Sequence, residues 1–138
     1  MGQFRVILDT NVLYAGLYSA RGASYKVLQA IDQGVIRIGL STTLLFEYED
    51  ILRRNSSLLG LTGNEIEEIL DGLCSGSDHQ KIYFLWRPQL SDPKDDHILE
   101  LAIASGTVPI VTHNTKDFKR AKEFDIRVIT PKQLLEEI

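Results

Sequence analysis

Several acidic and polar side chains in this sequence stand where an α/β sheet would bring them to one edge. Asp9 directly follows the apolar run 4–8, and Thr112, Asn114 and Asp117 follow the run that ends at Val111. If these runs are parallel strands, their carboxyl ends share one rim, where such sheets form ligand sites. For Asp9 alone, a helix cap is the simpler interpretation, because Asp is favoured at that position.

Further acids lie on a predicted helix that packs on the same core. Asp95 precedes Ile98 and Ala102 by three and seven residues, so it lies on the inward face of that helix, and Asp96 turns toward the edge of the face. In the first turn the helix dipole also favours an anion. Pooled carboxylates repel one another, and hard divalent cations with oxygen ligands relieve that repulsion. The acids therefore indicate a metal site, with a capping or dipole role as the alternative.

A second acidic position lies on the helix predicted after the Ser41/Thr42 cap. Glu47 stands beside one edge of its apolar stripe and Glu49 beside the other, so periodicity does not choose between them. Arg54 lies two turns after Glu47 on nearly the same side. Arg54 is therefore the first candidate for a contact with a phosphate backbone, although most basic side chains on helices are simply solvated.

Strand-like and helix-like periods alternate along the chain. The predicted strands are 4–8, 35–38, 81–85, 108–111 and 126–129. One predicted helix has its apolar face over 25–31 and ends at Gly34. The next ones begin at the cap 41–42 and at the capping box 62–65. Another begins at the cap Asp92 and ends at Gly106, and a terminal helix begins at 130–133. Strands separated by helices predict a three-layer α/β fold with a parallel sheet.

Composition limits the classes of protein that this chain fits. With 138 residues, 43% of them hydrophobic, it has the size of one compact domain. No export signal and no stretch long enough to cross a bilayer is apparent, so we expect an intracellular, cytoplasmic protein that does not enter the membrane. The net charge of −4 argues against non-specific coating of nucleic acid but leaves open an enzyme that acts on it.

Four motifs together carry a family resemblance. They are the run 7–13 with Asp9-Thr10-Asn11, Glu47, the run 92–96 with Asp95 and Asp96, and the run 111–118. In this order they resemble a PIN-domain ribonuclease, and more narrowly the branch of toxin components of toxin–antitoxin pairs that is related to VapC-type toxins. The resemblance implies one Rossmann-like PIN domain over 1–138, with about five parallel strands flanked by helices.

The same resemblance implies a carboxylate pocket that holds Mg²⁺ or Mn²⁺. By position, its first acid is Asp9, its second Glu47 and its third Asp95, with Asp96 as the alternative one residue along. Many relatives have Asp where this chain has Asn114, so the fourth position is open between Asp117 as a carboxylate and Asn114 as a neutral ligand or substrate contact. The implied activity is hydrolysis of RNA phosphodiester bonds, and the implied partners are an RNA substrate and a separate antitoxin protein.

Other residues are expected around the acids, in contact with them or with the substrate. They are Asn11, Thr112, Asn114, Arg54 and Lys116. Thr112 is a candidate to bind a metal-held water, although a hydroxyl that closes a strand is usually structural. Tyr83 and Trp86 stand next to an apolar run, which favours packing in the core or at a homodimer contact over stacking on a base. His79, His97 and His113 are interpreted as ordinary surface or supporting groups.

Two other functions remain open at this point. A Mg²⁺-dependent phosphotransfer or receiver-like domain also uses acids at strand ends, but it usually needs a paired acid near the first strand, and Asp9-Thr10-Asn11 has only one. A PIN-like module that binds RNA or a partner without cleaving is the non-enzymatic alternative, and it is favoured by the neutral Asn114.

Overall fold

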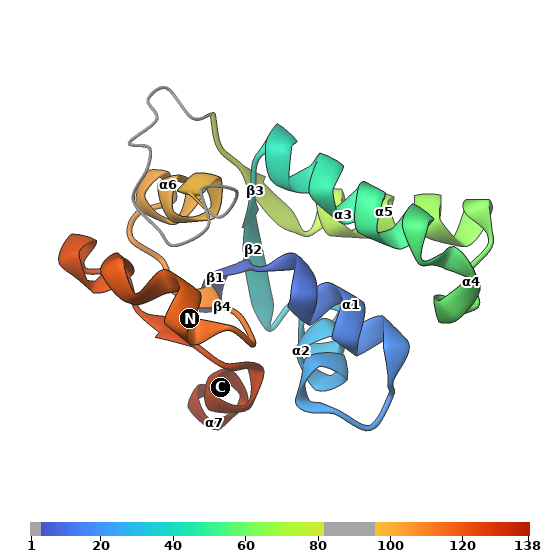
Figure 1. Cartoon of the computed structure of the whole chain (residues 1–138), viewed down its shortest axis with the longest axis horizontal. Coiled ribbons are helices and arrows are strands. Elements are labelled where there is room, and N and C mark those ends of the chain that lie inside the picture. Colours follow the sequence, from blue (N-terminus) through green and yellow to red (C-terminus); the bar gives the residue numbers. More distant parts are fainter. Residues whose placement is uncertain (1–3, 82–95) are drawn as a thin grey trace.

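A five-stranded parallel sheet forms the centre of the computed structural model, which describes residues 4–81 and 96–138 (Figure 1). Its strand order is β3-β2-β1-β4-β5, and every pairing is parallel. The strands are β1 (Phe4–Leu8), β2 (Ile36–Leu40), β3 (Ser77–His79), β4 (Ile110–Val111) and β5 (Val128–Ile129). The sheet confirms the predicted α/β fold class and its parallel strands.

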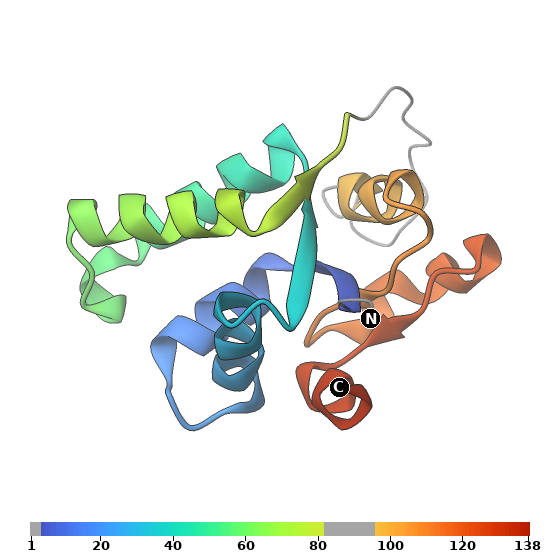
Figure 2. The same ribbon diagram turned by 180° about the vertical axis from the view of Figure 1, so that it is seen from behind.

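Helices cover both faces of this sheet. They are α1 (Thr10–Tyr18), α2 (Ala23–Asp32), α3 (Thr42–Arg54), α4 (Ser56–Leu59), α5 (Gly63–Ser75), α6 (Asp96–Ala104), the 3-10 helix η2 (Thr115–Phe124) and α7 (Pro131–Glu137). Figures 1 and 2 show α6 and η2 on one side of β2, with α1, α2 and α5 on the other. None of the helices in the described part is long and apolar enough to span a bilayer.

The strand order places a topological switch point between β1 and β4. From β1 the chain builds outward through β2 to β3, and it then returns to the other side of β1 to add β4 and β5. Loops leave adjacent strands in opposite directions at such a point, which opens a crevice at their carboxyl ends. Asp9 follows β1 and Thr112 follows β4, so both residues stand at this crevice.

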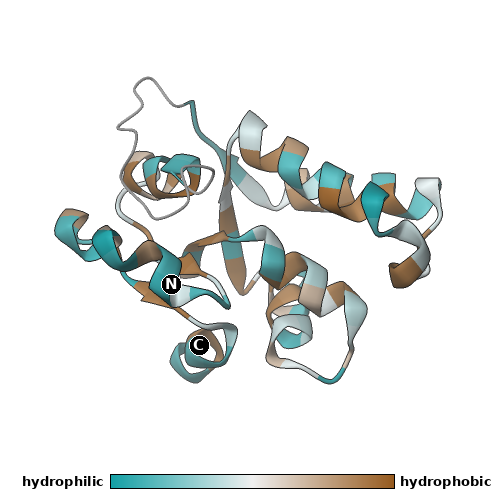
Figure 3. Ribbon diagram, in the orientation of Figure 1, coloured by the Kyte–Doolittle hydropathy of each residue, from teal (hydrophilic) through white to brown (hydrophobic). Residues whose placement is uncertain are grey.

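The core lies where the sheet meets the helices. Val6, Ile7 and Leu8 of β1 are fully buried, and Figure 3 shows apolar residues concentrated on the strands and on the inward sides of the helices. At Gly16 of α1, an added Cβ would lie 2.5 Å from Leu28 Cδ1 on α2. A side chain there would force the two helices apart, so glycine permits their close packing.

Local capping signals are confirmed where the structure describes them. Thr62 and Thr130 each complete a capping box at the start of a helix. Gly34 and Gly106 have φ values of +79° and +96°, as expected for residues that follow a helix end. These caps can be predicted from the sequence because a helix cap depends only on residues a few positions apart.

Two elements predicted in the middle of the chain, the strand 81–85 and the helix that begins at Asp92, fall partly outside the described residues. The third strand of the sheet is Ser77–His79. The strand predicted at 81–85 lies outside the described residues except for Lys81, which is not part of a strand. The polar β3 has no apolar run to reveal it, and pairing with β2 at the sheet edge defines it. The helix expected from Asp92 is described only from Asp96, because residues 82–95, which include Tyr83, Trp86 and Asp95, lie outside the described part.

Candidate active site

Asp9 occupies the end of the central strand and caps the helix that follows. Its Oδ1 accepts a hydrogen bond of 2.8 Å from the Thr10 amide, and its Oδ2 accepts one of 2.8 Å from the Thr112 hydroxyl. The residue is 7% exposed. The structure therefore joins the two interpretations of Asp9, because the carboxylate that caps α1 also lies at the switch point.

Thr112 is the fully buried group that holds this carboxylate. Its hydroxyl donates to Asp9 and accepts from Asn11 Nδ2 at 3.2 Å and from the Asn114 amide at 3.1 Å. A hydroxyl has one proton and two lone pairs, so all three are used. Thr112 therefore orients Asp9 through the one proton of its hydroxyl.

Asn11 and His113 complete the connection between α1 and the loop after β4. Asn11 Oδ1 accepts a hydrogen bond of 3.3 Å from the His113 amide, while its Nδ2 donates to Thr112. The His113 ring forms a hydrogen bond of 2.7 Å with the hydroxyl of the buried Ser24 on α2. Asn11 therefore links α1 to Thr112 and to the loop after β4.

Glu47 is the acid of α3 that faces Asp9. Its Oε2 lies 2.5 Å from Nε2 of His97, a residue that is 5% exposed at the start of α6. Its charge also contributes to raising the pKa of Asp9. Glu49 instead binds Arg53 at 2.9 Å on the exposed surface. The structure therefore resolves the choice that periodicity left open, in favour of Glu47 as the acid that faces Asp9.

Tyr48 fixes the separation of these two acids. Its hydroxyl donates a 2.5 Å hydrogen bond to the Leu8 carbonyl, and its side chain is fully buried. Tyr48 follows Glu47 in α3 and Leu8 precedes Asp9 in β1, so this bond joins the immediate neighbours of both acids. Burial, together with the charges of Asp9 and Glu47, holds the pKa of Tyr48 well above its ordinary value, so the hydroxyl stays protonated and continues to donate.

Sequence reasoning missed the specific roles of Tyr48 and His97. The sequence alone does not single out Tyr48, and it favours an ordinary surface or supporting role for His97. A signal existed in both cases, because Tyr48 adjoins Glu47 and His97 adjoins Asp96, and each places a hydrogen-bonding group beside a candidate acid. Their partners are 40 and 50 residues away in the chain, so only the fold identifies them.

The electrostatics around Asp9 oppose its negative charge. Burial is the largest cause that raises the pKa of Asp9, and the charge of Glu47 adds to it, while the bonds from Thr112 and Thr10 lower it. In the described part of the chain no lysine or arginine pairs with Asp9. Two oxygen ligands of like charge, facing each other without a basic partner for Asp9, are the donor set that a hard divalent cation suits. Asp9 and Glu47 therefore fit such a cation.

The remaining expected acids are not shown to join this pair. Asp96 is 1% exposed at the start of α6, and the first seven residues of this helix, Asp96–Ala102, are all buried. Asp117 is half-buried in the first turn of η2, where its amide donates to the Asn114 carbonyl at 3.0 Å. Within residues 4–81 and 96–138, no three acidic, histidine or cysteine residues gather closely enough to hold a metal ion. Asp95, the expected third acid, lies outside that part.

The expected substrate contacts are dispersed. Arg54 forms an exposed ion pair of 2.7 Å with Asp50, on the outward face of α3, so no contact brings it to Asp9. Lys116 is exposed near the start of η2 and forms no ion pair within the described residues. Asn114 is exposed beside Thr112, with only its amide engaged at the site. Of these residues, Asn114 and Lys116 stand on the loop and helix that follow β4.

In a comparison with protein families, residues 5–116 match the PIN domain. The chain belongs to the PIN-domain family. PIN domains are generally nucleases and typically use divalent metal ions. The predicted PIN fold is confirmed, and the receiver-like alternative is set aside. In this PIN domain, Asp9 lies at the end of β1, and the charge of Glu47 acts on it.

A comparison with solved structures agrees with the family. The PIN domain is similar to a chain in the crystal structure of VapBC2 from Rickettsia felis bound to a DNA fragment from their promoter. The TM-score is 0.63 at 18% sequence identity, and the alignment covers 92% of this chain and 98% of that one. A comparison with curated protein sequences gives no significant match. At this identity, the structural likeness supports the fold.

Proposed function

We propose that this PIN domain is a metal-dependent ribonuclease that hydrolyses RNA phosphodiester bonds. The observation that carries the proposal is the buried Asp9 carboxylate at the β1–β4 switch point, held by Thr112 and facing Glu47. Asp9, Glu47 and Asp95 would hold Mg²⁺ or Mn²⁺, with Asp117 or Asn114 at the fourth position. The bound ion would lower the pKa of a water and stabilise negative charge on the phosphate.

The chain's own residues would keep the acids in position during this reaction. Thr112 holds Asp9 in one rotamer, and His97 holds one oxygen of Glu47, which leaves the other oxygen for a ligand. Tyr48 keeps α3 at a fixed distance from β1. Catalytic groups that are fixed in advance lose less entropy and need less rearrangement when substrate binds.

Hydrolysis by an activated water is favoured over attack by the ribose hydroxyl. The latter route commonly uses histidines as general acid and base. In this structure His97 is engaged with Glu47, His113 is engaged with Ser24, and His79 lies on the edge strand β3. No pair of histidines among the described residues therefore faces the candidate site. Water attack with departure of the 3′ oxygen leaves a 5′-phosphate and a 3′-hydroxyl.

We also propose that this nuclease is the toxin of a toxin–antitoxin pair. The motifs resemble VapC-type toxins, and the similar solved structure is of a VapBC2 assembly. The antitoxin would be a separate polypeptide that restrains the nuclease by binding it.

Cleavage of RNA, with identification of the product ends, tests the proposed activity. The purified chain is incubated with a mixed-sequence single-stranded RNA or the matched DNA, in Mn²⁺ or in EDTA. We expect cleavage of RNA in Mn²⁺ alone, with 5′-phosphate and 3′-hydroxyl ends. Products with 2′,3′-cyclic phosphate, or cleavage that persists in EDTA, would contradict the mechanism. Absence of both cleavage and Mn²⁺ binding would favour the non-enzymatic module.

A further inference from the structure

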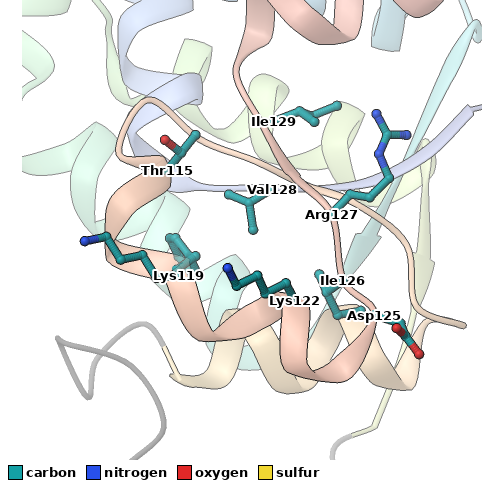
Figure 4. A pocket seen from close by; sticks show the side chains of 9 residues that line it. Thr115, Lys119, Lys122, Asp125, Ile126, Arg127, Val128 and Ile129 are labelled. Carbon is teal, nitrogen blue, oxygen red and sulfur yellow. The ribbon is translucent and has the colours of Figure 1, made fainter.

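A hollow lies between η2, the helix that follows β4, and the edge strand β5 (Figure 4). Its volume is about 760 Å³, within the range of small-molecule sites in proteins. We call it the η2–β5 cavity. Its floor is apolar, and its rim carries the basic Lys119, Lys122 and Arg127 together with the acidic Asp125. The apolar floor and the mainly basic rim suit different parts of a nucleotide.

The floor of the η2–β5 cavity is apolar and fixed. Phe118, Ile126 and Ile129 are 1%, 3% and 6% exposed, and Val128 is half-buried beside them. Figure 4 shows Val128 between the strand and the helix, facing η2. A nucleobase has two apolar faces, and protein sites that bind single-stranded RNA commonly pack them on such side chains.

The rim of the cavity carries two lysines that have no partner in the described part of the chain. Lys119 and Lys122 are exposed, three residues apart on η2, and no hydrogen bond or ion pair engages either one there. Nearby arginines are occupied, since Arg120 pairs with Glu123 and Arg127 with Glu137. Two like charges at this spacing on a helix are unfavourable, and an anion between them would relieve the repulsion.

The cavity is continuous along the chain with the candidate active site. Thr115 lines the cavity and directly follows Asn114, whose amide bonds to the Thr112 hydroxyl that holds Asp9. The helix that extends from Thr115 carries four basic and two acidic residues, in a chain whose net charge is −4. A substrate strand that reaches Asp9 could therefore continue along a locally positive element.

We infer that the η2–β5 cavity is a nucleotide subsite for single-stranded RNA. It receives a nucleotide next to the cleaved bond, with the base on the apolar floor and a phosphate between Lys119 and Lys122. A base that is paired in a duplex cannot enter the cavity, so the subsite selects unpaired RNA. This inference rests on the proposed function, because it assumes that RNA is the substrate.

Salt-dependent RNA binding by charge-matched variants tests the subsite. The double variant Lys119→Gln/Lys122→Gln is compared with Lys26→Gln/Lys132→Gln, which removes the same charge from exposed positions on α2 and α7. All proteins also carry Asp9→Asn, which prevents cleavage during a fluorescence titration in Mg²⁺. The probes are a labelled single-stranded RNA of ten nucleotides and its duplex form.

We expect the cavity variant to lose about 0.7 per lysine from the slope of log K against log salt, and to bind single-stranded RNA about tenfold more weakly at low salt. The control variant keeps the slope and affinity of its parent, and both variants bind the duplex alike. If the two variants bind single-stranded RNA with equal affinity and equal salt slope, the proposed subsite is contradicted. Equal losses for single-stranded RNA and duplex would also overturn it, because they would indicate a general phosphate patch.

The same experiment separates this inference from the proposed function. If the parent binds no RNA and the wild-type chain cleaves none, the proposed function fails and the subsite fails with it. If the wild-type chain cleaves RNA but the cavity variant and its control are indistinguishable, only the subsite is wrong.

Discussion

Asp9→Asn is expected to lower the rate of RNA cleavage by at least about 10²-fold, since a metal ion stabilises a phosphoryl transition state by several kcal/mol and each 1.4 kcal/mol is a factor of ten. Asn still accepts a bond from the Thr10 amide and caps helices well, so α1 should persist. Its neutral amide, however, binds a hard cation more weakly than the buried carboxylate does.

The matched control for this variant is Asp71→Asn, which removes a carboxylate from the exposed surface of α5. Cleavage rates are compared at saturating Mn²⁺, and circular dichroism establishes that all three proteins are folded. Asp71→Asn should keep the wild-type rate. An Asp9→Asn protein that is folded and cleaves RNA within about threefold of wild type, a difference worth less than 1 kcal/mol, would remove Asp9 from the reaction.

The second large effect concerns the stability that a bound metal ion contributes. Mn²⁺ at about one hundred times its dissociation constant should raise the free energy of unfolding of the wild-type chain by about 2.7 kcal/mol. If Glu47 is a ligand, Glu47→Gln weakens the site at least tenfold, and the same Mn²⁺ concentration then stabilises that variant by about 1.4 kcal/mol or less. Urea denaturation with and without Mn²⁺ measures the difference.

Glu49→Gln is the matched control, because Glu49 is two residues away on α3 but binds the exposed Arg53. It should keep the full Mn²⁺ stabilisation and lose at most about 1 kcal/mol of metal-free stability. Equal responses of the two variants to Mn²⁺ would contradict the role assigned to Glu47. This comparison needs no RNA, so it remains informative whatever the substrate is.

The raised pKa of Asp9 determines how the metal-free stability and the stability gained from Mn²⁺ should each change with pH. The pKa of Asp9 is raised in the folded chain, so the folded state binds its proton more tightly than the unfolded state does. Metal-free stability from this group is therefore present at low pH and falls as the pH rises through the raised pKa of Asp9. A cation favours the ionised carboxylate, so the Mn²⁺-dependent gain in stability should increase over the same range.

The parts of the fold that the sequence predicted are those specified by neighbouring residues. The capping boxes at Thr62 and Thr130 and the left-handed glycines at Gly34 and Gly106 depend on a few adjacent positions. The apolar run of β1 also indicated a buried strand, and Val6, Ile7 and Leu8 are all buried in the structure. Such patterns can be recognised in the sequence without knowing which distant residues the segment contacts.

The parts that escaped prediction depend on distant residues. Ser77–His79 is polar and becomes a strand through pairing with β2, and Asp78 is held there by Arg37 at 2.7 Å and by Arg5 at 2.5 Å. Glu47 and Glu49 are equivalent by helical periodicity. Their difference comes from His97, which is far along the chain and lies against only one of them.

Thr112 is the clearest case of a residue whose role required the structure. Its type and position left two roles open, the structural role that is usual for a hydroxyl closing a strand and a contact with a metal-held water. Three hydrogen bonds to Asp9, Asn11 and the Asn114 amide use its whole capacity. The sequence located the residue, but only the set of contacts distinguishes a group that binds a ligand from one that orients a ligand.

The most direct test of a metal site at the β1–β4 switch point is a crystal structure of the chain soaked with Mn²⁺, with the ion located by its anomalous scattering. We predict an ion coordinated by carboxylate oxygens of Asp9 and Glu47 at about 2.1 Å, with Asp95 as a third ligand. A well-ordered crystal with no ion at this position, or with Mn²⁺ bound elsewhere while Asp9 and Glu47 stay uncoordinated, would contradict the proposed site.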